Sequence, residues 1–187
     1  MYVKCSVFIA ASVDGFIARP DGDIEWLHQP AYETAELKGV TYENFIATVD
    51  ALVMGRKTLE KVLSFPEWPY EGTPVIVLSY QQLQIPAHLE GKVKVMAGDV
   101  TSLVATLAER GMKHLYIDGG QTIQAFLEAG LVNELIITRI PVVLGQGIPL
   151  FSQVGSEQEL HHVATYVSDN GFVQSRYQVT AGAHAAQ

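Results

Sequence analysis

Residues 51–58, Ala-Leu-Val-Met-Gly-Arg-Lys-Thr, contain the transition that decides the fold class. The four apolar residues predict a short buried strand, and Gly55-Arg56-Lys57-Thr58 predicts the start of a helix directly after it. Two cations at a helix N-terminus oppose the helix dipole, so their presence needs a reason. In open α/β sheets, phosphates bind where a strand ends and a helix begins. We therefore favour an anion site here over a solvated helix start with incidental charges.

Strand and helix patterns alternate on both sides of this segment. They predict strands at 3–11, 75–78, 93–96, 114–117 and 134–141, and helices at 41–48, 101–110 and 121–129. The first strand is almost continuously apolar, which indicates a central strand buried on both faces. Two β-prone runs flank Asn170-Gly171 and predict a closing hairpin whose two central turn residues both adopt positive φ. The fold class is therefore α/β, with one mixed, mostly parallel sheet, helices on both faces and a C-terminal antiparallel hairpin.

The composition is that of a single globular domain. Its 187 residues are 48% hydrophobic and 17% charged, which suits one domain at 1–180 followed by a flexible tail at 181–187. The net charge of −8, without a Lys/Arg run, argues against nucleic-acid and anionic-membrane partners. No apolar stretch approaches the ~20 residues of a membrane span, and the N-terminus lacks a signal-peptide pattern. A cytoplasmic protein is therefore expected.

A second glycine-rich turn follows the predicted strand at 114–117. Gly119 and Gly120 let the backbone approach a ligand closely, and the helix beginning near Gln121-Thr122 directs its N–H groups to the same place. This turn is not the G-x-G-x-x-G fingerprint, and Gly-Gly alone is also a common turn. Two anion sites after two different strands suit a dinucleotide better than a single phosphate.

The loop after the first strand supplies the candidate substrate residues. Asp14 follows the end of that strand, where loops often contact substrates, and is a candidate to orient or protonate one. An Asx-turn beside Gly15 is the structural alternative for the same side chain. Trp26, further along, is either a pocket wall or ordinary packing.

Three further features predict structure rather than chemistry, and none predicts a metal site. Glycines and prolines in the apolar segment 140–151 specify a rigid, buried loop. The acidic run 21–25 is a solvated turn, since it lacks the length and terminal Glu of an EF-hand loop. His161 and His162 adjoin on a predicted strand, so their side chains face opposite sides and cannot share a metal. Cys5 is the only cysteine, which excludes an intrachain disulfide and a thiolate metal cluster.

Five motifs in order make the chain resemble the dihydrofolate reductase superfamily. They are 12–18 (Ser-Val-Asp-Gly-Phe-Ile-Ala), 22–27 (Gly-Asp-Ile-Glu-Trp-Leu), 49–58, 117–120 (Ile-Asp-Gly-Gly) and 140–151. The chain is most similar to stand-alone homologues of the C-terminal reductase domain of the bacterial riboflavin-synthesis deaminase/reductase. The resemblance covers nearly the whole chain and implies a three-layer α–β–α fold, NADPH as cofactor and a homodimer.

The resemblance also implies which residues hold the cofactor. The adenosine side matches Gly55, Arg56, Lys57, Thr58, Leu78, Ser79 and Tyr80; the pyrophosphate turn matches Gly119, Gly120, Gln121 and Thr122; the nicotinamide wall matches Ala10, Ala11 and Ile17. Two cations favour NADPH over NADH, because the 2′-phosphate binds charged donors. The implied reaction is hydride transfer to a small heterocyclic or sugar-imine substrate, with 5-amino-6-(5-phosphoribosylamino)uracil as the family's reference substrate. Asp14 is the predicted catalytic group, and Asp14 and Trp26 are the predicted substrate contacts.

Three alternatives stay open at this point. Dihydrofolate reduction is the first, but that enzyme carries a carboxylate shortly after its tryptophan, and here only Glu33 or Glu36 follows Trp26 at a comparable place. A protein that binds NADPH without catalysis is the second. The third is an apolar interaction domain, which predicts no affinity for NADPH at all.

Overall fold

One eight-stranded sheet organises the chain. The computed structural model describes residues 2–33, 35–152, 154–155 and 157–180, so the tail predicted at 181–187 lies outside the described residues. The strand order is β5-β4-β3-β6-β1-β7-β10-β9. The strands are β1 (Lys4–Ser12), β3 (Ala51–Gly55), β4 (Val75–Leu78), β5 (Val93–Met96), β6 (His114–Ile117), β7 (Glu134–Ile140), β9 (Glu159–Val167) and β10 (Val173–Thr180). All pairs from β5 to β7 are parallel and the last two are antiparallel, so the mixed sheet with β1 at its centre is confirmed.

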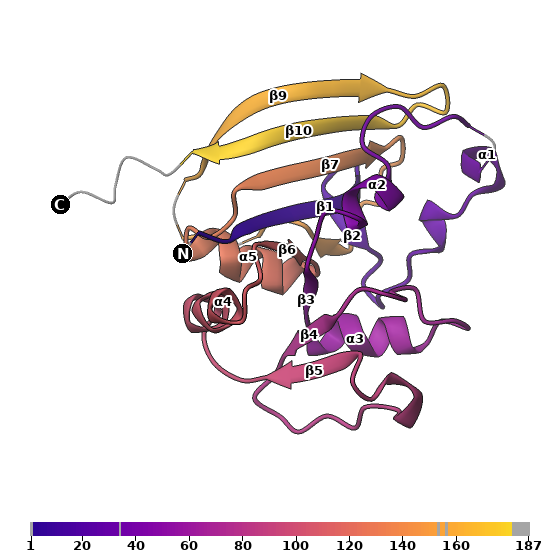
Figure 1. The fold of residues 1–187 in the computed structure, drawn as a ribbon. Helices are drawn as coiled ribbons and strands as arrows, with labels where there is room; N and C mark the ends of the chain where they lie inside the picture. Colours follow the sequence, from indigo (N-terminus) through magenta and orange to yellow (C-terminus); the bar gives the residue numbers. More distant parts are fainter. Residues whose placement is uncertain (1, 34, 153, 156, 181–187) are drawn as a thin grey trace.

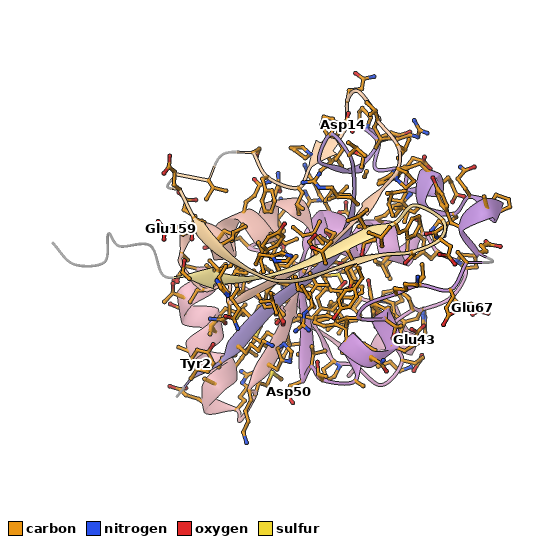
Figure 2. All side chains as sticks on the ribbon, turned by 90° about the horizontal axis from the view of Figure 1, so that it is seen from above. Tyr2, Asp14, Glu43, Asp50, Glu67 and Glu159 are labelled. Atoms are coloured by element: carbon orange, nitrogen blue, oxygen red, sulfur yellow. The ribbon has the colours of Figure 1, made fainter. Side chains whose placement is uncertain are left out.

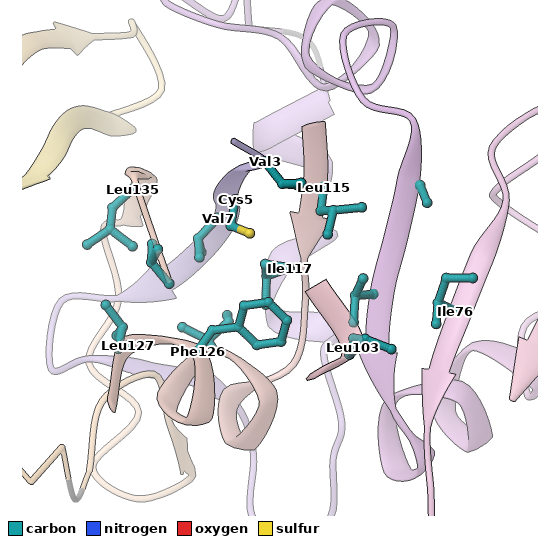
Figure 3. Packing of buried hydrophobic residues seen from close by; sticks show 14 of the residues in the cluster. Val3, Cys5, Val7, Ile76, Leu103, Leu115, Ile117, Phe126, Leu127 and Leu135 are labelled. Atoms are coloured by element: carbon teal, nitrogen blue, oxygen red, sulfur yellow. The ribbon is translucent and has the colours of Figure 1, made fainter. Parts of the chain in front are cut away.

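Helices cover both faces of this sheet, which confirms the three-layer α/β arrangement (Figure 1). On one face, α4 (Val100–Glu109) and α5 (Gly120–Glu128) pack through Leu103 and Phe126 against Val7 and Ile117 of the sheet (Figure 3). On the other face, α2 (Tyr42–Ile46) and α3 (Arg56–Leu63) pack against alternate strand residues. Side chains of a strand alternate between faces, and here both faces are apolar. The near-continuous apolar runs of the sequence follow from this double burial.

Several short elements have no periodic hydrophobic pattern in the sequence from which they could be predicted. β2 (Phe16–Ala18) pairs with β8 (Ile148–Pro149) in a separate two-stranded sheet. The remaining short helices are η1 (Glu25–Leu27), α1 (Pro30–Glu33) and η2 (Ala87–Leu89). No helix among the described residues is long and apolar enough to cross a membrane.

Part of the segment 140–151 pairs with β2 through the short strand β8. The prediction that this segment is buried was wrong. Val143 is 68% exposed and Phe151 is 43% exposed, whereas Leu150 is buried. The glycines and prolines of this segment shape a surface loop that pairs with β2, as the contact of Gly147 with Phe16 and Ala18 shows. The glycines and prolines therefore indicated the backbone geometry of this segment, not its burial.

The closing hairpin is confirmed, but its turn differs from the predicted one. Gly171 has a φ of +85°, and no non-glycine residue in the described part of the chain has positive φ, so Asn170 does not share this conformation. The Gly171 N–H donates to Ser168 O at 3.0 Å, and the Ser168 N–H donates to Phe172 O at 2.9 Å. An ordinary β-turn followed by a left-handed glycine makes this hairpin, so only the glycine needed the special backbone conformation.

A charged cluster closes the amino-terminal edge of the sheet. Glu134, only 8% exposed, accepts a hydrogen bond from Ser6 Oγ at 3.0 Å. Its carboxylate also pairs with Lys4 Nζ at 2.8 Å and with Arg176 Nη2 at 2.7 Å. Burial alone would raise the pKa of Glu134, but the hydrogen bonds from Lys4 and Arg176 outweigh it and lower the pKa to about 2. Figure 2 labels Tyr2 near this edge, and Asp14 at the opposite end of the strands.

The protein should lose stability in acid because of this cluster. The pKa of Glu134 falls from an ordinary 4.5 to about 2 on folding, so its contribution is complete above pH 4.5 and disappears as pH falls towards 2. We expect Glu134→Gln to lower the free energy of unfolding by about 2–3 kcal/mol at neutral pH. The difference from the parent should shrink through that window, as measured by urea unfolding. Glu71→Gln, which breaks the exposed pair with Lys92, is the control, with an expected loss below about 1 kcal/mol. A pH-independent difference would contradict the ionic origin of the effect.

Candidate functional site

β1 and β6 part at the carboxyl-terminal edge of the sheet, and we call this gap between the two strands the crevice. β1 pairs with β6 only over Lys4–Ser6, whereas its register with β7 continues to Ser12. After Ile117 the chain leaves the sheet and enters α5. Among the described residues, the later half of β1 therefore has no strand neighbour on its β6 side. Open α/β sheets bind ligands at such crevices, and the predicted nicotinamide wall at Ala10 and Ala11 lies on this stretch.

Two helices begin at this edge without a capping side chain. Gly55 precedes α3 and Gly119 precedes α5, and neither helix has a side-chain cap hydrogen bond. By contrast, the hydroxyl of Thr41 caps α2 and the carboxylate of Asp99 caps α4. The first N–H groups of a helix need an acceptor from outside the helix. α3 and α5 therefore present free donors to an anion at the positive ends of their dipoles.

The two uncapped helix starts contact each other through their glycines. Gly119 has a φ of +90°, and a Cβ added there would collide with Thr58 Oγ1. A Cβ added at Gly55 would stand 3.0 Å from Thr122 Oγ1. A side chain at either glycine would push the two turns apart. The two turns that the sequence predicts as anion sites thus lie against each other.

The small sheet of β2 and β8 adjoins this site. A Cβ at Gly120 would stand 3.3 Å from Ile17 Cδ1 and 3.0 Å from Pro149 O. Ile17, the third residue of the predicted nicotinamide wall, therefore lies beside the glycine turn. Ile17 keeps some exposed surface beside this turn, whereas Ala11 is only 1% exposed.

The residues predicted for the adenosine side lie together at the ends of β3 and β4. Gly55 pairs in register with Leu78, so Ser79 and Tyr80 follow beside the start of α3. Tyr80 is 83% exposed. Arg56 Nη1 pairs with Glu60 at 2.6 Å and remains partly exposed. These side chains line one accessible edge, although Arg56 must release Glu60 before it can pair fully with a phosphate.

Asp14 holds a loop in place through both of its carboxylate oxygens. Oδ1 accepts from Ser12 Oγ at 2.6 Å and from the Leu144 N–H at 3.1 Å, and Oδ2 accepts from the Gly145 N–H at 2.7 Å. The bond from Ser12, followed by those backbone bonds, lowers the pKa of Asp14. The Asx-turn alternative is not formed, because Ser12 Oγ accepts the Phe16 N–H instead. An ionised carboxylate with these bonds is suited to positioning the loop, and its catalytic role stays a prediction.

Asp14→Asn should loosen the loop around residues 144–145. The amide nitrogen of Asn cannot accept the N–H groups that the carboxylate holds. We expect amide exchange at Leu144 and Gly145 to accelerate roughly tenfold, with KM rising more than kcat falls. Asp21→Asn is the control, since Asp21 also accepts a backbone N–H in an exposed turn. A fall in kcat with unchanged amide exchange would instead assign Asp14 to the reaction itself.

Asp118, which was not among the predicted site residues, is the carboxyl group at the crevice. It directly follows β6, keeps some exposed surface, and accepts the Gly119 N–H at 2.9 Å. Burial raises the pKa of Asp118 to about 6, against the lowering effect of that hydrogen bond. A carboxyl group with such a pKa can exchange a proton near neutral pH. Its sequence signal was its position just before the two glycines.

Six aromatic rings lie on the α2/α3 side of the sheet, and we call them the aromatic cluster. The ring pairs and their centroid separations are Phe8–Phe45 at 4.9 Å, Phe45–Tyr116 at 5.0 Å, Phe8–Tyr42 at 6.1 Å and Trp68–Tyr70 at 5.3 Å. Tyr116 and Asp118 are two positions apart along the same strand direction, so they face the same side. Tyr116 of this cluster and Asp118 thus lie on the same side of the sheet at the end of β6.

Trp26 lies in η1 and is only 3% exposed, and its indole N–H has no hydrogen-bond partner among the described residues. Its burial fits ordinary packing, and its substrate contact stays a prediction. In the described part of the chain, no group of three or more His, Cys, Asp or Glu side chains is arranged to hold a metal ion.

Known proteins match this chain over nearly all of its length. The family model of the RibD C-terminal domain matches residues 3–174. The uncharacterized protein YwjB of Bacillus subtilis (strain 168) is 36% identical over 165 residues, which are 84% of this chain and 87% of that protein. A putative riboflavin biosynthesis protein from Shewanella sp. PV-4 has a similar crystal structure, with a TM-score of 0.86, 39% identity, and coverage of 95% of this chain and 99% of that chain. Dihydrofolate reductase from Enterococcus faecalis, complexed with NADP(H), has a TM-score of 0.66 at 19% identity, covering 96% of this chain and 99% of its own, and so shares the fold.

Proposed function

We propose that this chain, which belongs to the RibD C-terminal domain family, is an NADPH-dependent reductase of a small heterocyclic or imine substrate. The family match and the shared fold confirm the resemblance drawn from the five sequence motifs. The family match and the shared fold support a reductase-type role for this chain. The cofactor, the kind of substrate and the roles of individual residues are our proposal.

One observation carries this proposal: two uncapped helix N-termini meet at the crevice. The residues present fit a dinucleotide phosphate, because free N–H groups and close-packed glycines meet there and α3 begins with Arg56 and Lys57. The turn from Gly119 to Thr122 would hold the pyrophosphate, and Arg56 with Lys57 would hold the 2′-phosphate. NADPH, when bound, supplies the hydride.

The chain itself would position the substrate and manage a proton. Ala10 and Ile17, which both keep exposed surface, would form an apolar wall on one side of the crevice. Asp118 stands at the neighbouring strand end, where its carboxyl group, with a pKa of about 6, can protonate a substrate nitrogen. Protonation of an imine nitrogen makes its carbon a better hydride acceptor. Asp14 would keep the 144–145 loop in place beside this site.

Titration with NADPH and NADH tests the cofactor assignment. At a hundredfold excess over Kd, NADPH should stabilise the protein by about 2.7 kcal/mol, or roughly 5–10 °C in Tm for a chain of this size. We expect Arg56→Ala to weaken NADPH binding roughly 10–100-fold and to leave NADH binding unchanged, because only NADPH carries the 2′-phosphate. Lys61→Ala, in the last turn of the same helix, is the matched control. No shift with either nucleotide would contradict the proposed function.

A further inference from the structure

The short strand β8 rests on the first turns of α5. A Cβ added at Gly120 would stand 3.0 Å from Pro149 O and 3.8 Å from Ile148 Cγ2. The absence of a side chain at Gly120 therefore lets the backbone of β8 lie directly on the helix. Gln124 lies four positions further along α5, so its side chain projects from the same face of the helix.

Gln124 holds the chain after β8 with both ends of its side-chain amide. Nε2 donates to Leu150 O at 3.2 Å, and Oε1 accepts the hydroxyl hydrogen of Ser152 at 2.8 Å. A carbonyl oxygen can only accept, so Leu150 O fixes which end of the amide faces it. Two bonds from one half-buried side chain therefore hold residues 150–152 against α5 in a single arrangement.

β8 carries β2 with it. The two strands pair in the small antiparallel sheet, and the Leu150 N–H donates to Gly15 O at 2.9 Å. A Cβ added at Gly147 would collide with Ala18 O, so the two backbones are also in close contact. The two strands therefore form one unit, and a side chain that holds Leu150 on α5 also holds β2 there.

Ile17 is the side chain whose position depends on this unit. It lies on β2 and keeps some exposed surface, and its Cδ1 is 3.3 Å from the place of a Cβ at Gly120. Gly120 belongs to the turn that we propose for the pyrophosphate, and Ile17 belongs to the wall that we propose for the nicotinamide. A shift of β8 along α5 would therefore move the wall relative to the turn and leave the N–H groups of the turn in place.

We propose that Gln124 is a positioning residue for the nicotinamide half of the cofactor, because its amide holds β8 on α5 and β8 holds Ile17 beside the pyrophosphate turn. The proposal rests on the proposed function, since it concerns how the same site holds NADPH. Hydride transfer needs the two carbon atoms close together and aligned, and a displacement of about 1 Å can cost roughly 100-fold in rate. Gln124 therefore governs how firmly the nicotinamide ring is aligned, and not how tightly the whole cofactor binds.

Amide exchange in the protein without cofactor tests the mechanical step. Gln124→Met keeps the length of the side chain and removes both hydrogen bonds. We expect exchange at Leu150 to accelerate roughly tenfold, while exchange at Leu144, which Asp14 holds, stays within about twofold. Gln178→Met, the same change at an exposed position of β10, is the matched control and should alter neither. Unchanged exchange at Leu150 in the Gln124 variant would overturn the proposal.

The fluorescence anisotropy of bound NADPH tests the positioning step. In the parent protein the nicotinamide ring should turn only with the whole molecule, so the anisotropy decays slowly. We expect Gln124→Met to add a fast component from motion of the ring within its site, while Kd for NADPH stays within about threefold. A loss of stability alone would leave the slow decay unchanged. Ser152→Ala, which removes one of the two bonds and leaves α5 unaltered, should show the same fast component with a smaller amplitude.

The possible results separate this proposal from the proposed function. A slow decay with normal NADPH affinity in Gln124→Met would overturn the positioning role and leave the reductase function standing. A Kd raised about tenfold or more would show that Gln124 supports the pyrophosphate turn instead, and would also overturn the proposal. If the parent protein does not bind NADPH, the proposed function fails, and the positioning role fails with it.

Discussion

Replacement of Asp118 by asparagine should lower kcat on the order of 10²–10³-fold with a neutral imine substrate, while NADPH affinity changes little. Asparagine has nearly the same shape as aspartate but cannot deliver a proton. The carboxyl group lies at the end of β6, beside the crevice, and the glycine turn next to it carries the backbone donors for the cofactor. Turnover measured by NADPH oxidation, with Kd measured separately, distinguishes loss of proton transfer from loss of binding.

The pH dependence gives the same prediction a second readout. The pKa of Asp118 is raised by burial to about 6, so the group is protonated below that value and ionised above it. For an imine that stays neutral, kcat/KM should therefore fall as pH rises through about 6, and the variant should lose this step.

Asp118→Asn should raise the stability of the protein although it lowers kcat. The folded-state pKa of Asp118 lies above its ordinary 3.8, so ionisation of the buried group lowers stability as pH rises from 3.8 to about 6. Asparagine avoids this loss, and we expect Asp118→Asn to unfold at a higher Tm than the parent at neutral pH. Asp50→Asn is the matched control: its carboxylate accepts the N–H groups of Lys113 and His114, so its loss should lower Tm without changing kcat. An Asp118→Asn variant with normal kcat would remove Asp118 from the reaction.

The sequence could predict what depends on local pattern. The parallel strands were readable because burial on both faces leaves continuous apolar runs, and the helix α2 was readable from its cap at Thr41. The helix α4 begins one residue earlier than predicted, since Asp99 caps it. The glycine turns at Gly55 and Gly119 were also predictable, because glycine next to a helix start reports a close approach of backbone.

What the sequence could not supply depends on distant partners. Asp14 is held by N–H groups of Leu144 and Gly145, some 130 positions along the chain, so its structural use was invisible beside its own neighbours. The importance of Asp118 arises from burial, which exists only after β6 has inserted between β3 and β1. The exposure of 140–151 likewise follows from its pairing with a three-residue strand that no periodicity could reveal.

Gly119→Ala should weaken NADPH binding by at least about 100-fold, through two separate effects. Its φ of +90° is one that a residue with a Cβ rarely adopts, at an energy of about 1–3 kcal/mol. The added methyl would also meet Thr58 Oγ1, so the starts of α3 and α5 must separate. Because the proposed cofactor site consists of N–H groups from both helix starts, their separation removes the geometry that binds the pyrophosphate.

Gly111→Ala introduces the backbone strain without the collision, so a comparison of the two variants separates the two effects. Gly111 follows α4 with a φ of +86°, and nothing lies within 4 Å of the place its Cβ would take. Both variants should therefore lose a comparable stability of about 1 kcal/mol from backbone strain, and Gly119→Ala should lose more because of the collision. Only Gly119→Ala should lose NADPH affinity, as measured by nicotinamide fluorescence. A Thr58→Ser change in the Gly119→Ala background keeps the colliding oxygen, whereas Thr58→Ala removes it and should restore part of the binding. If Gly119→Ala binds NADPH as tightly as Gly111→Ala does, the contact between the two helix starts is packing alone, and the cofactor must bind elsewhere.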